Sequence, residues 1–184
     1  MTMTTTSSHV TAPVSAAFRP ALADDAAPLA AFAERTFRVQ FGPHNTASDM
    51  DAYCAAAFGP SQQRGELADP ARRTTLVTLD GRLAGYAQLR SGPPPAFVVG
   101  DAPIELVRFY IDHPWHGRGL AQSLMAHTLE LARQGGARTL YLAVWDRNDR
   151  AIAFYTRQGF VLVGTKDFTL GTDRQVDHVM ARAL

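Results

Sequence analysis

The chain has 184 residues, of which 46% are hydrophobic and 19% charged, so it can bury a core and is neither disordered nor fibrous. Eighteen Lys and Arg residues against 17 Asp and Glu residues give a formal net charge of +1, which disfavours a general nucleic-acid binder or a basic membrane-surface protein. The single cysteine, Cys54, excludes an intrachain disulfide or a cysteine-based metal cluster and suits a reducing cytoplasm.

The first residues are rich in Ser and Thr, with neither the basic region nor the apolar region of a signal peptide. No later stretch approaches the roughly 18 apolar residues of a membrane span. We therefore expect a flexible tail at residues 1–16 and a single domain at residues 17–184. We expect this domain to bind no membrane, nucleic acid or metal, and we leave open whether it forms a homodimer.

The first half of this domain begins with a short expected strand at residues 18–21. Apolar residues at helical spacing then predict a helix that follows Asp25 and ends at Gly42. A second helix at residues 48–58 carries Cys54 on its apolar side, where a core position is favoured over a catalytic thiol because no neighbour in the sequence would lower its pKa. A short amphipathic segment follows at residues 60–67.

The middle of the chain predicts a β-hairpin. Two β-prone runs at residues 74–79 and 83–89 are joined by Asp80-Gly81, a strong hairpin signal. The run Gly92-Pro-Pro-Pro95 makes a stiff loop, and a further strand is expected at residues 104–112.

The second half alternates helices and strands. We expect a helix from Leu120 to the Gly135-Gly136 pair, a buried strand at 139–145, a helix at 149–158 and two closing strands at 160–168 and 176–182. The order predicts one mixed α/β domain with a crossover helix between two neighbouring strands.

A glycine-rich turn between the strand at 104–112 and the following helix is the first candidate site. Gly117 and Gly119 have no side chains to block a pyrophosphate, and the helix that follows presents its amides and its dipole to an anion. Taken alone, this segment fits a tight strand-to-helix turn equally well. It is not a P-loop, because no Gly-Lys-Ser/Thr follows.

The second candidate segment lies on the helix at 149–158. Asn148 stands at its expected N-cap, and Ile152 and Tyr155 lie along one face. Together the two segments read His116-x-x-Gly119-x-Ala121 and Asn148-x-x-Ala151-x-x-x-Tyr155-x-x-x-Gly159-Phe160. This combination resembles the GNAT superfamily of acyl-CoA-dependent N-acyltransferases, whose motifs are Q/R-x-x-G-x-G/A and N-x-x-A-x-x-x-Y-x-x-x-G-F. The second motif matches throughout, and the first departs at His116.

The resemblance extends from about Phe18 to the C-terminus and implies the GNAT fold. That fold is a single mixed, mostly antiparallel sheet of about seven strands flanked by helices, with splayed central strands that hold acyl-CoA. It implies acetyl-CoA as cosubstrate, with pantetheine bound to the backbone of Phe109, Tyr110 and Ile111. The remaining implied contacts come from His116, Gly117, Arg118, Gly119, Leu120, Ala121, Gln122, Ser123, Asn148 and Tyr155. A neutral imidazole at His116 would support the phosphates less than Arg.

The resemblance also implies direct attack by an amine on the thioester. An alkyl ammonium must lose a proton first, and Glu105, eleven positions before His116, is the candidate base. An ion pair of Glu105 with Arg108 or another neighbour explains this carboxylate almost as well. We expect the Tyr110 backbone N–H to stabilise the oxyanion and Tyr155 to protonate the departing thiolate.

The sequence also resembles the bacterial PaiA-type spermidine/spermine N-acetyltransferases, which implies a polyamine as the amine that accepts the acetyl group. The matching pieces are Thr36-Phe37, Phe41, Asp49-Met50, Ala52-Tyr53, Ala57-Phe58, Val144-Trp145, Ala151 to Tyr155, Phe168, Gly171, Gln175 and Asp177. Asp49, Asp51, Glu105 and Tyr53 could wall a polyamine site, although the two aspartates also suit a helix's first turn.

Two alternatives stay open. An N-terminal protein, peptide or amino-acid acetyltransferase is disfavoured by Ala143, where the ribosomal-protein type carries glutamate. A non-catalytic acyl-CoA-binding regulatory module is disfavoured by the presence of both Glu105 and Tyr155.

Overall fold

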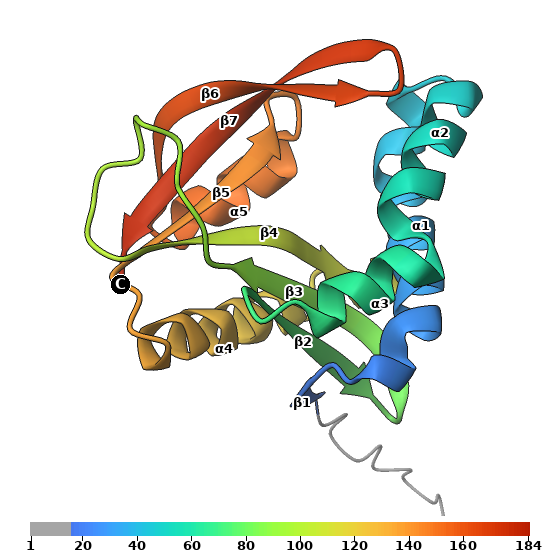
Figure 1. Cartoon of the computed structure of the whole chain (residues 1–184), viewed down its shortest axis with the longest axis horizontal. Helices are drawn as coiled ribbons and strands as arrows, with labels where there is room; N and C mark the ends of the chain where they lie inside the picture. The colour runs from blue at the N-terminus through green and yellow to red at the C-terminus, as the bar shows by residue number, and fades with distance from the viewer. Residues whose placement is uncertain (1–15) are drawn as a thin grey trace, which may run out of the picture.

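The computed structural model describes residues 16–184, so most of the expected tail lies outside the described residues. Its elements form one seven-stranded sheet in the order β1-β2-β3-β4-β5-β7-β6, flanked by helices (Figure 1). The strands are β1 Ala16–Pro20, β2 Arg72–Leu79, β3 Arg82–Arg90, β4 Pro103–Ile111, β5 Thr139–Trp145, β6 Val161–Leu170 and β7 Asp173–Ala183. Ala16 therefore belongs to the sheet and not to the tail.

Helices cover both faces of this sheet. They are α1 Ala26–Phe41, α2 Ala47–Phe58, α3 Pro60–Ala68, α4 Leu120–Gln134 and α5 Asp149–Arg157. The buried residues of α4 recur at helical spacing, so one side of α4 packs on the sheet while the other faces water. Figure 1 shows α4 well separated from α1, α2 and α3, which stand together beyond the other side of the sheet. None of the helices within residues 16–184 is long and apolar enough to cross a bilayer.

Two main apolar clusters make up the core. The first joins α4 and α5 to one face of the central strands and includes Leu124, Leu140 and Phe160. The second joins α1 and α2 to the opposite face and includes Leu29, Tyr86 and Cys54, which is 1% exposed. Cys54 is thus the core residue that its position on the helix predicts, and burial raises the pKa of its thiol.

The sheet opens between β4 and β5. These two strands run parallel but pair over only four residues, from Pro103 opposite Thr139 to Leu106 opposite Leu142. At that point the register between β3 and β4 shifts, so that Val107 is an extra residue with no partner in β3. A β-bulge of this kind bends its strand. The bent end of β4, Arg108 to Ile111, therefore leaves β5 while it remains paired with β3.

The closing hairpin is longer than the sequence predicts. β6 and β7 pair from Val161 opposite Ala181 to Leu170 opposite Asp173, with a register shift between Leu162 and Gly164, around a tight turn at Gly171 and Thr172. The sequence predicts strands at 160–168 and 176–182, whereas in the structure β6 continues to Leu170 and β7 begins at Asp173. β6 is an edge strand with a largely exposed surface, so it needs little apolar periodicity.

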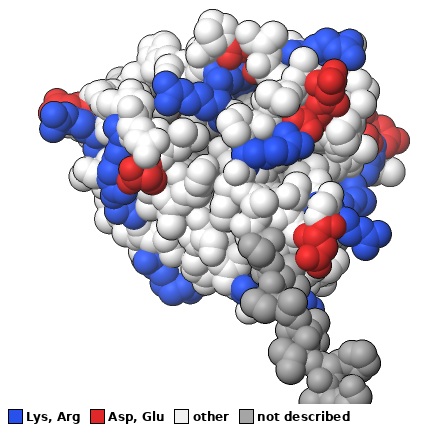
Figure 2. Space-filling model, turned by 90° about the horizontal axis from the view of Figure 1, so that it is seen from below, with Lys and Arg blue, Asp and Glu red and all other residues white. Residues whose placement is uncertain are grey.

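The predicted hairpin at Asp80-Gly81 is confirmed. Both turn residues have positive φ, 49° and 74°, as a two-residue turn between right-twisted strands requires. On the face drawn in Figure 2, basic and acidic side chains are interspersed and form no extended region of one sign.

Candidate functional site

A cavity with a volume of about 780 Å³ lies where β4 and β5 separate. One end is formed by the glycine turn before α4 and by α5. The other end is formed by α1, α2 and the β6–β7 hairpin. Most of the predicted site residues line it: Glu105, Phe109, Tyr110, Ile111, His116, Gly117, Gly119, Ala121, Gln122, Asn148 and Tyr155.

Three predicted contacts lie outside the cavity wall. Leu120 is 6% exposed and packs into the core, and the Arg118 guanidinium lies 5.3 Å from the centre of the Trp115 ring. Ser123 donates both its backbone N–H and its hydroxyl to the Gly119 carbonyl. A side-chain role of these three residues toward a phosphate is therefore not supported by this geometry.

The glycine turn forms an open cradle of amides. Gly117 and Gly119 have φ of 74° and 81°, which side-chain-bearing residues rarely adopt, and the space where a Cβ would stand is empty at both. Gly119 is the N-cap of α4 and offers no side chain to cap it. Among the described residues, the backbone N–H groups of residues 117–122 make no backbone hydrogen bond. Unpaired amides at the positive end of a helix dipole fit a pyrophosphate.

His116 is linked to a cation that the sequence motifs do not indicate. The Arg150 guanidinium lies 2.6 Å from His116 Nδ1, and His116 Nε2 lies 2.8 Å from the Ile111 carbonyl. Arginine only donates hydrogen bonds, so Nδ1 accepts and the proton lies on Nε2. Burial, with a contribution from the Arg150 charge, lowers the pKa of His116 and keeps it neutral at pH 7. The positive charge at this mouth of the cavity is thus carried by Arg150 on α5.

The orientation of the β4 backbone revises one predicted role. Asp112 donates its backbone N–H to Ala84 on β3, and orientation repeats every two residues in an antiparallel ladder. Tyr110, opposite Tyr86, therefore directs its amide toward β3. Phe109 and Ile111 direct theirs into the gap. The oxyanion role predicted for the Tyr110 N–H does not fit, and the Phe109 N–H takes its place as the candidate.

Tyr155 and Asn148 hold the positions on α5 that the second motif predicts. Tyr155 is 8% exposed, packs edge-on against Phe109 and Phe160, and lines the cavity. Burial raises the pKa of its phenol well above the usual value, so the hydroxyl is protonated at neutral pH. Asn148 accepts a hydrogen bond from the Ala151 amide at 3.2 Å, which makes it the N-cap of α5 as well as a cavity residue.

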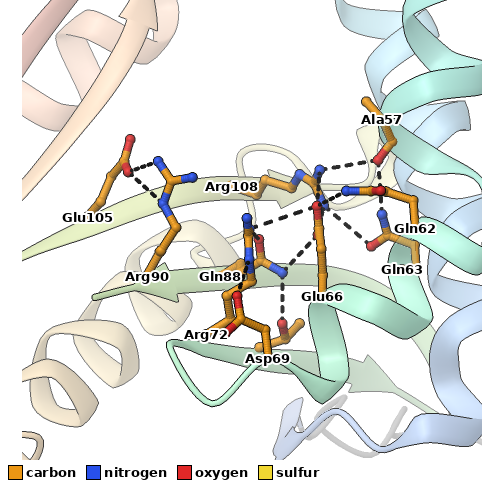
Figure 3. A network of polar contacts seen from close by, with 11 residues as sticks. Ala57, Gln62, Gln63, Glu66, Asp69, Arg72, Gln88, Arg90, Glu105 and Arg108 are labelled. Carbon is orange, nitrogen blue, oxygen red and sulfur yellow. Dashed lines mark hydrogen bonds and ion pairs between the residues drawn. The ribbon is translucent and has the colours of Figure 1, made fainter. Parts of the chain in front are cut away.

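Glu105 is held between two cations. Its Oε2 receives hydrogen bonds from Arg90 Nε at 3.1 Å and from the Arg90 terminal nitrogen at 2.5 Å (Figure 3). Lys166 Nζ lies 4.0 Å from Oε1. The alternative prediction, that Glu105 forms an ion pair with Arg108 or another neighbour, is confirmed. The partner is Arg90 on β3, and not Arg108. Its carboxylate also borders the cavity.

Arg108 belongs to a separate buried network that fastens α3 to the sheet. It forms an ion pair with Glu66 and donates to the Ala57 carbonyl at 3.2 Å (Figure 3). Gln88, fully buried on β3, donates to Glu66 at 3.2 Å and accepts from Arg72 at 2.9 Å. The polar contacts that these groups make offset the cost of removing their charges from water.

The acceptor end of the cavity is aromatic. Tyr53 stacks on Phe37 with ring centres 4.8 Å apart and meets Phe168 edge-on at 5.5 Å. Phe41, Phe58 and Trp145 complete this aromatic wall. Of the acidic residues predicted to wall a polyamine site, Asp49 and Asp51 are not in the cavity. Asp49 binds the β6–β7 turn, and Asp51 is exposed and forms an ion pair with Arg38. Asp177, a carboxylate for which the sequence predicts no role, lines the cavity instead.

Comparison with known proteins agrees with this geometry. The acetyltransferase (GNAT) family pattern matches residues 33–160. An uncharacterised N-acetyltransferase of Mycobacterium tuberculosis is 35% identical over 87% of this chain and 98% of its own length. The N-alpha-acetyltransferase RimI of M. tuberculosis is 33% identical over 58% of this chain and 63% of its own length. The spermine/spermidine N(1)-acetyltransferase of Bacillus subtilis is 30% identical over 48% of this chain and 59% of its own.

Among solved structures, a PaiA N-acetyltransferase from Thermoplasma acidophilum, determined in complex with coenzyme A, superposes with a TM-score of 0.74 at 15% identity. The match covers 92% of this chain and 99% of the other, which establishes a common fold. The family pattern and the relative that matches over 98% of its length establish the family as well as the fold. The chain belongs to the acetyltransferase (GNAT) family and is an N-acetyltransferase.

Proposed function

We propose that the protein transfers an acetyl group from acetyl-CoA to the primary amine of a small cationic acceptor by direct attack in a ternary complex. One observation carries the proposal. The open amide cradle, the bent end of β4 and the Tyr155 phenol all border a single cavity that also reaches an aromatic acceptor end. Cys54 lies in the core and takes no part.

The chain's own groups fit coenzyme A. Amides of the cradle, chiefly those of Gly119, Ala121 and Gln122, would bind the pyrophosphate, and Arg150 would supply the charge that His116 lacks. The backbone groups of Phe109 and Ile111 that face the gap would pair with pantetheine as a further strand would. The bulge at Val107 thus produces both the space and the backbone groups that face it.

The chemistry requires four proton or charge events. The acceptor ammonium loses a proton, directly or through water, with Glu105 as the candidate base. Its nitrogen then attacks the thioester carbon, and the Phe109 N–H would bind the oxygen as it becomes negative. When the carbon–sulfur bond breaks, the carbonyl re-forms and the electron pair stays on sulfur. The protonated phenol of Tyr155 is placed to donate its proton to the thiolate, and the former amine nitrogen gives up its second proton, directly or through water, to restore the phenol and leave a neutral amide.

A polyamine is the first candidate acceptor. It is supported by the PaiA-like residues, by the partial match to the Bacillus spermine/spermidine enzyme and by the aromatic wall, which suits a cation. The partial match to RimI, an N-alpha-acetyltransferase, supports a terminal amine of a peptide as the second candidate. Both acceptors present a primary ammonium at neutral pH.

The deciding experiment measures thiol release from acetyl-CoA with a panel of acceptors. The panel includes spermidine, spermine, a peptide with a free α-amine, amino acids and an aminoglycoside. Release that depends on spermidine supports the polyamine. Release only with the peptide moves the assignment to a terminal amine. If no member of a broad amine panel supports turnover while CoA still binds, the protein is a binding module and the proposal fails.

A further inference from the structure

Asp177 is a carboxylate without a cation. It is 8% exposed and lies on β7 opposite Trp145 of β5 and Lys166 of β6. Within residues 16–184, no Lys, Arg or His nitrogen approaches its oxygens within 4.0 Å, and it makes no side-chain hydrogen bond. Lys166, its cross-strand neighbour, lies 4.0 Å from Glu105 instead.

This arrangement is costly for the folded protein. Burial disfavours the charged form and raises the pKa of Asp177, with a further contribution from Asp146, even though Lys166 and His178 oppose the shift. The other acidic residues near the cavity are engaged, Glu105 by Arg90 and Asp49 by Thr172. Asp177 therefore differs from them in offering a free negative charge to the cavity.

The surroundings of Asp177 favour a cation. It shares the acceptor end with Tyr53, Phe41 and Trp145, whose aromatic rings attract positive charge. Burial raises the pKa of the Tyr53 phenol; the Arg108 charge opposes this shift, and the Asp177 charge adds to it. An organic ammonium at this position would donate an ionic hydrogen bond to the Asp177 carboxylate and would contact aromatic rings on its other sides.

We propose that Asp177 binds a positively charged nitrogen of the acceptor and so selects cationic substrates. The proposal rests on the proposed function, because it places an amine in this cavity. It does not depend on whether that amine belongs to a polyamine or to a peptide. It makes Asp177 a substrate-binding residue distinct from the candidate base, Glu105.

Calorimetric titration of the CoA-saturated protein tests this without turnover, since CoA carries no acetyl group to transfer. The probes are 1,4-diaminobutane, the peptide Ala-Gly-Gly-amide and 1,4-butanediol, which is the neutral counterpart of the diamine. The variants are Asp177→Asn and, as matched control, Asp167→Asn, which changes an exposed aspartate on the same hairpin. We expect the parent to bind at least one cationic probe and not the diol. Loss of a hydrogen bond to a charged group predicts that Asp177→Asn binds this probe roughly 10- to 100-fold more weakly.

Two further readouts separate binding from a structural role. Asp177→Asn should raise the KM for the acceptor by the same factor and leave the KM for acetyl-CoA near the parent value. It should also melt at or above the parent temperature, because it removes an unpaired buried charge. Parent-like affinity for the cationic probe in Asp177→Asn, or equal binding of diamine and diol by the parent, would overturn the proposal. Absence of transfer by the parent would contradict the proposed function instead, and calorimetry would still decide the role of Asp177.

Discussion

At the scale of single residues, the Tyr155 hydroxyl is separable from the Tyr155 ring. The ring packs between Phe109 and Phe160 and the hydroxyl lines the cavity, so Tyr155→Phe keeps the packing and removes only the donor. General-acid contributions run to roughly 10²- to 10⁴-fold, and we expect kcat to fall within that range. Binding of acetyl-CoA, measured by its KM and by thermal shift, should stay near the parent value.

The control for this prediction is Tyr141→Phe. Tyr141 is also a buried tyrosine, but it belongs to a different apolar cluster and does not line the large cavity. Equal effects of the two changes on kcat would reduce Tyr155 to a packing residue.

Glu105 can be tested through the pH dependence of the rate. Glu105→Gln keeps the shape of the side chain. It removes the basicity of the carboxylate and the negative charge that pairs with Arg90. If Glu105 accepts the proton of the ammonium, the rate of the variant should fall most at low pH and recover partly as pH approaches the amine pKa of about 10. The profile of kcat/KM against pH should therefore be steeper than that of the parent.

Arg90→Met separates the base from the ion pair. It removes the partner of Glu105 and leaves the carboxylate, so it should preserve the pH profile of the parent while lowering stability. A profile of Glu105→Gln that runs parallel to the parent would remove Glu105 from the base role.

The sequence predicts a site residue well when that residue belongs to a short motif of neighbouring positions in the chain. Gly117, Gly119 and Tyr155 stand at fixed spacing in local motifs, and all three line the cavity. Arg150 and Asp177 have neighbours that lie far away in the sequence or on other strands. Arg150 donates to Gln40 on α1, and Asp177 lies between β5 and β6. Arg150, for example, meets His116 across 34 positions of sequence. Periodicity carries no information about such contacts, and neither residue has a predicted role.

At the scale of elements, a clasp between α2 and the β6–β7 turn positions the acceptor end. Asp49 on α2 receives hydrogen bonds from the Thr172 amide at 2.6 Å, from the Thr172 hydroxyl at 3.1 Å and from the Thr46 hydroxyl at 2.7 Å. Gly171 permits the approach, because a Cβ there would lie 2.1 Å from Asp49 Oδ1. The sequence places Asp49 in a helix's first turn but gives no indication of this partner.

This clasp predicts a dependence of stability on pH. The hydrogen bond from Thr46, followed by that from the Thr172 amide, lowers the folded-state pKa of Asp49 below 3.8. A carboxylate with a depressed pKa stabilises the folded state above its unfolded pKa and loses that contribution as pH falls through the folded pKa. Asp49→Asn should therefore melt below the parent at pH 7, and the difference should narrow once pH falls below 3.8.

Asp51→Asn is the control for the clasp, since Asp51 lies two positions away on the same helix and is exposed. It should change the melting temperature little at any pH. A difference between Asp49→Asn and the parent that stays constant from pH 7 to pH 3 would show that the Asp49 charge does not contribute.

At the scale of the whole molecule, the sheet consists of two parts joined by few contacts. β1 to β4 form one part and β5 to β7 the other, and only four residue pairs between β4 and β5 connect them. A pantetheine chain in the gap would bridge both parts. The order of elements predicts one mixed α/β domain with a crossover helix, and the resemblance to the GNAT superfamily implies the splayed central strands. The place where the strands separate depends on the bulge at Val107, which has no sequence signal of its own.

Acetyl-CoA should consequently stabilise the whole domain. A ligand at 100 times its Kd adds about 2.7 kcal/mol to the free energy of unfolding, which for a chain of this size raises the melting temperature by about 5–10 °C.

Gly119→Glu should abolish the shift, because it places a carboxylate in the phosphate cradle. Gly136→Glu is the matched control, since Gly136 has a similar φ of 84°, open space and a place at the opposite end of α4. Both variants bear the same backbone strain and the same added charge, so each should melt below the parent without ligand. Only Gly136→Glu should then regain the increase with acetyl-CoA. A full shift in Gly119→Glu would place the phosphate site elsewhere.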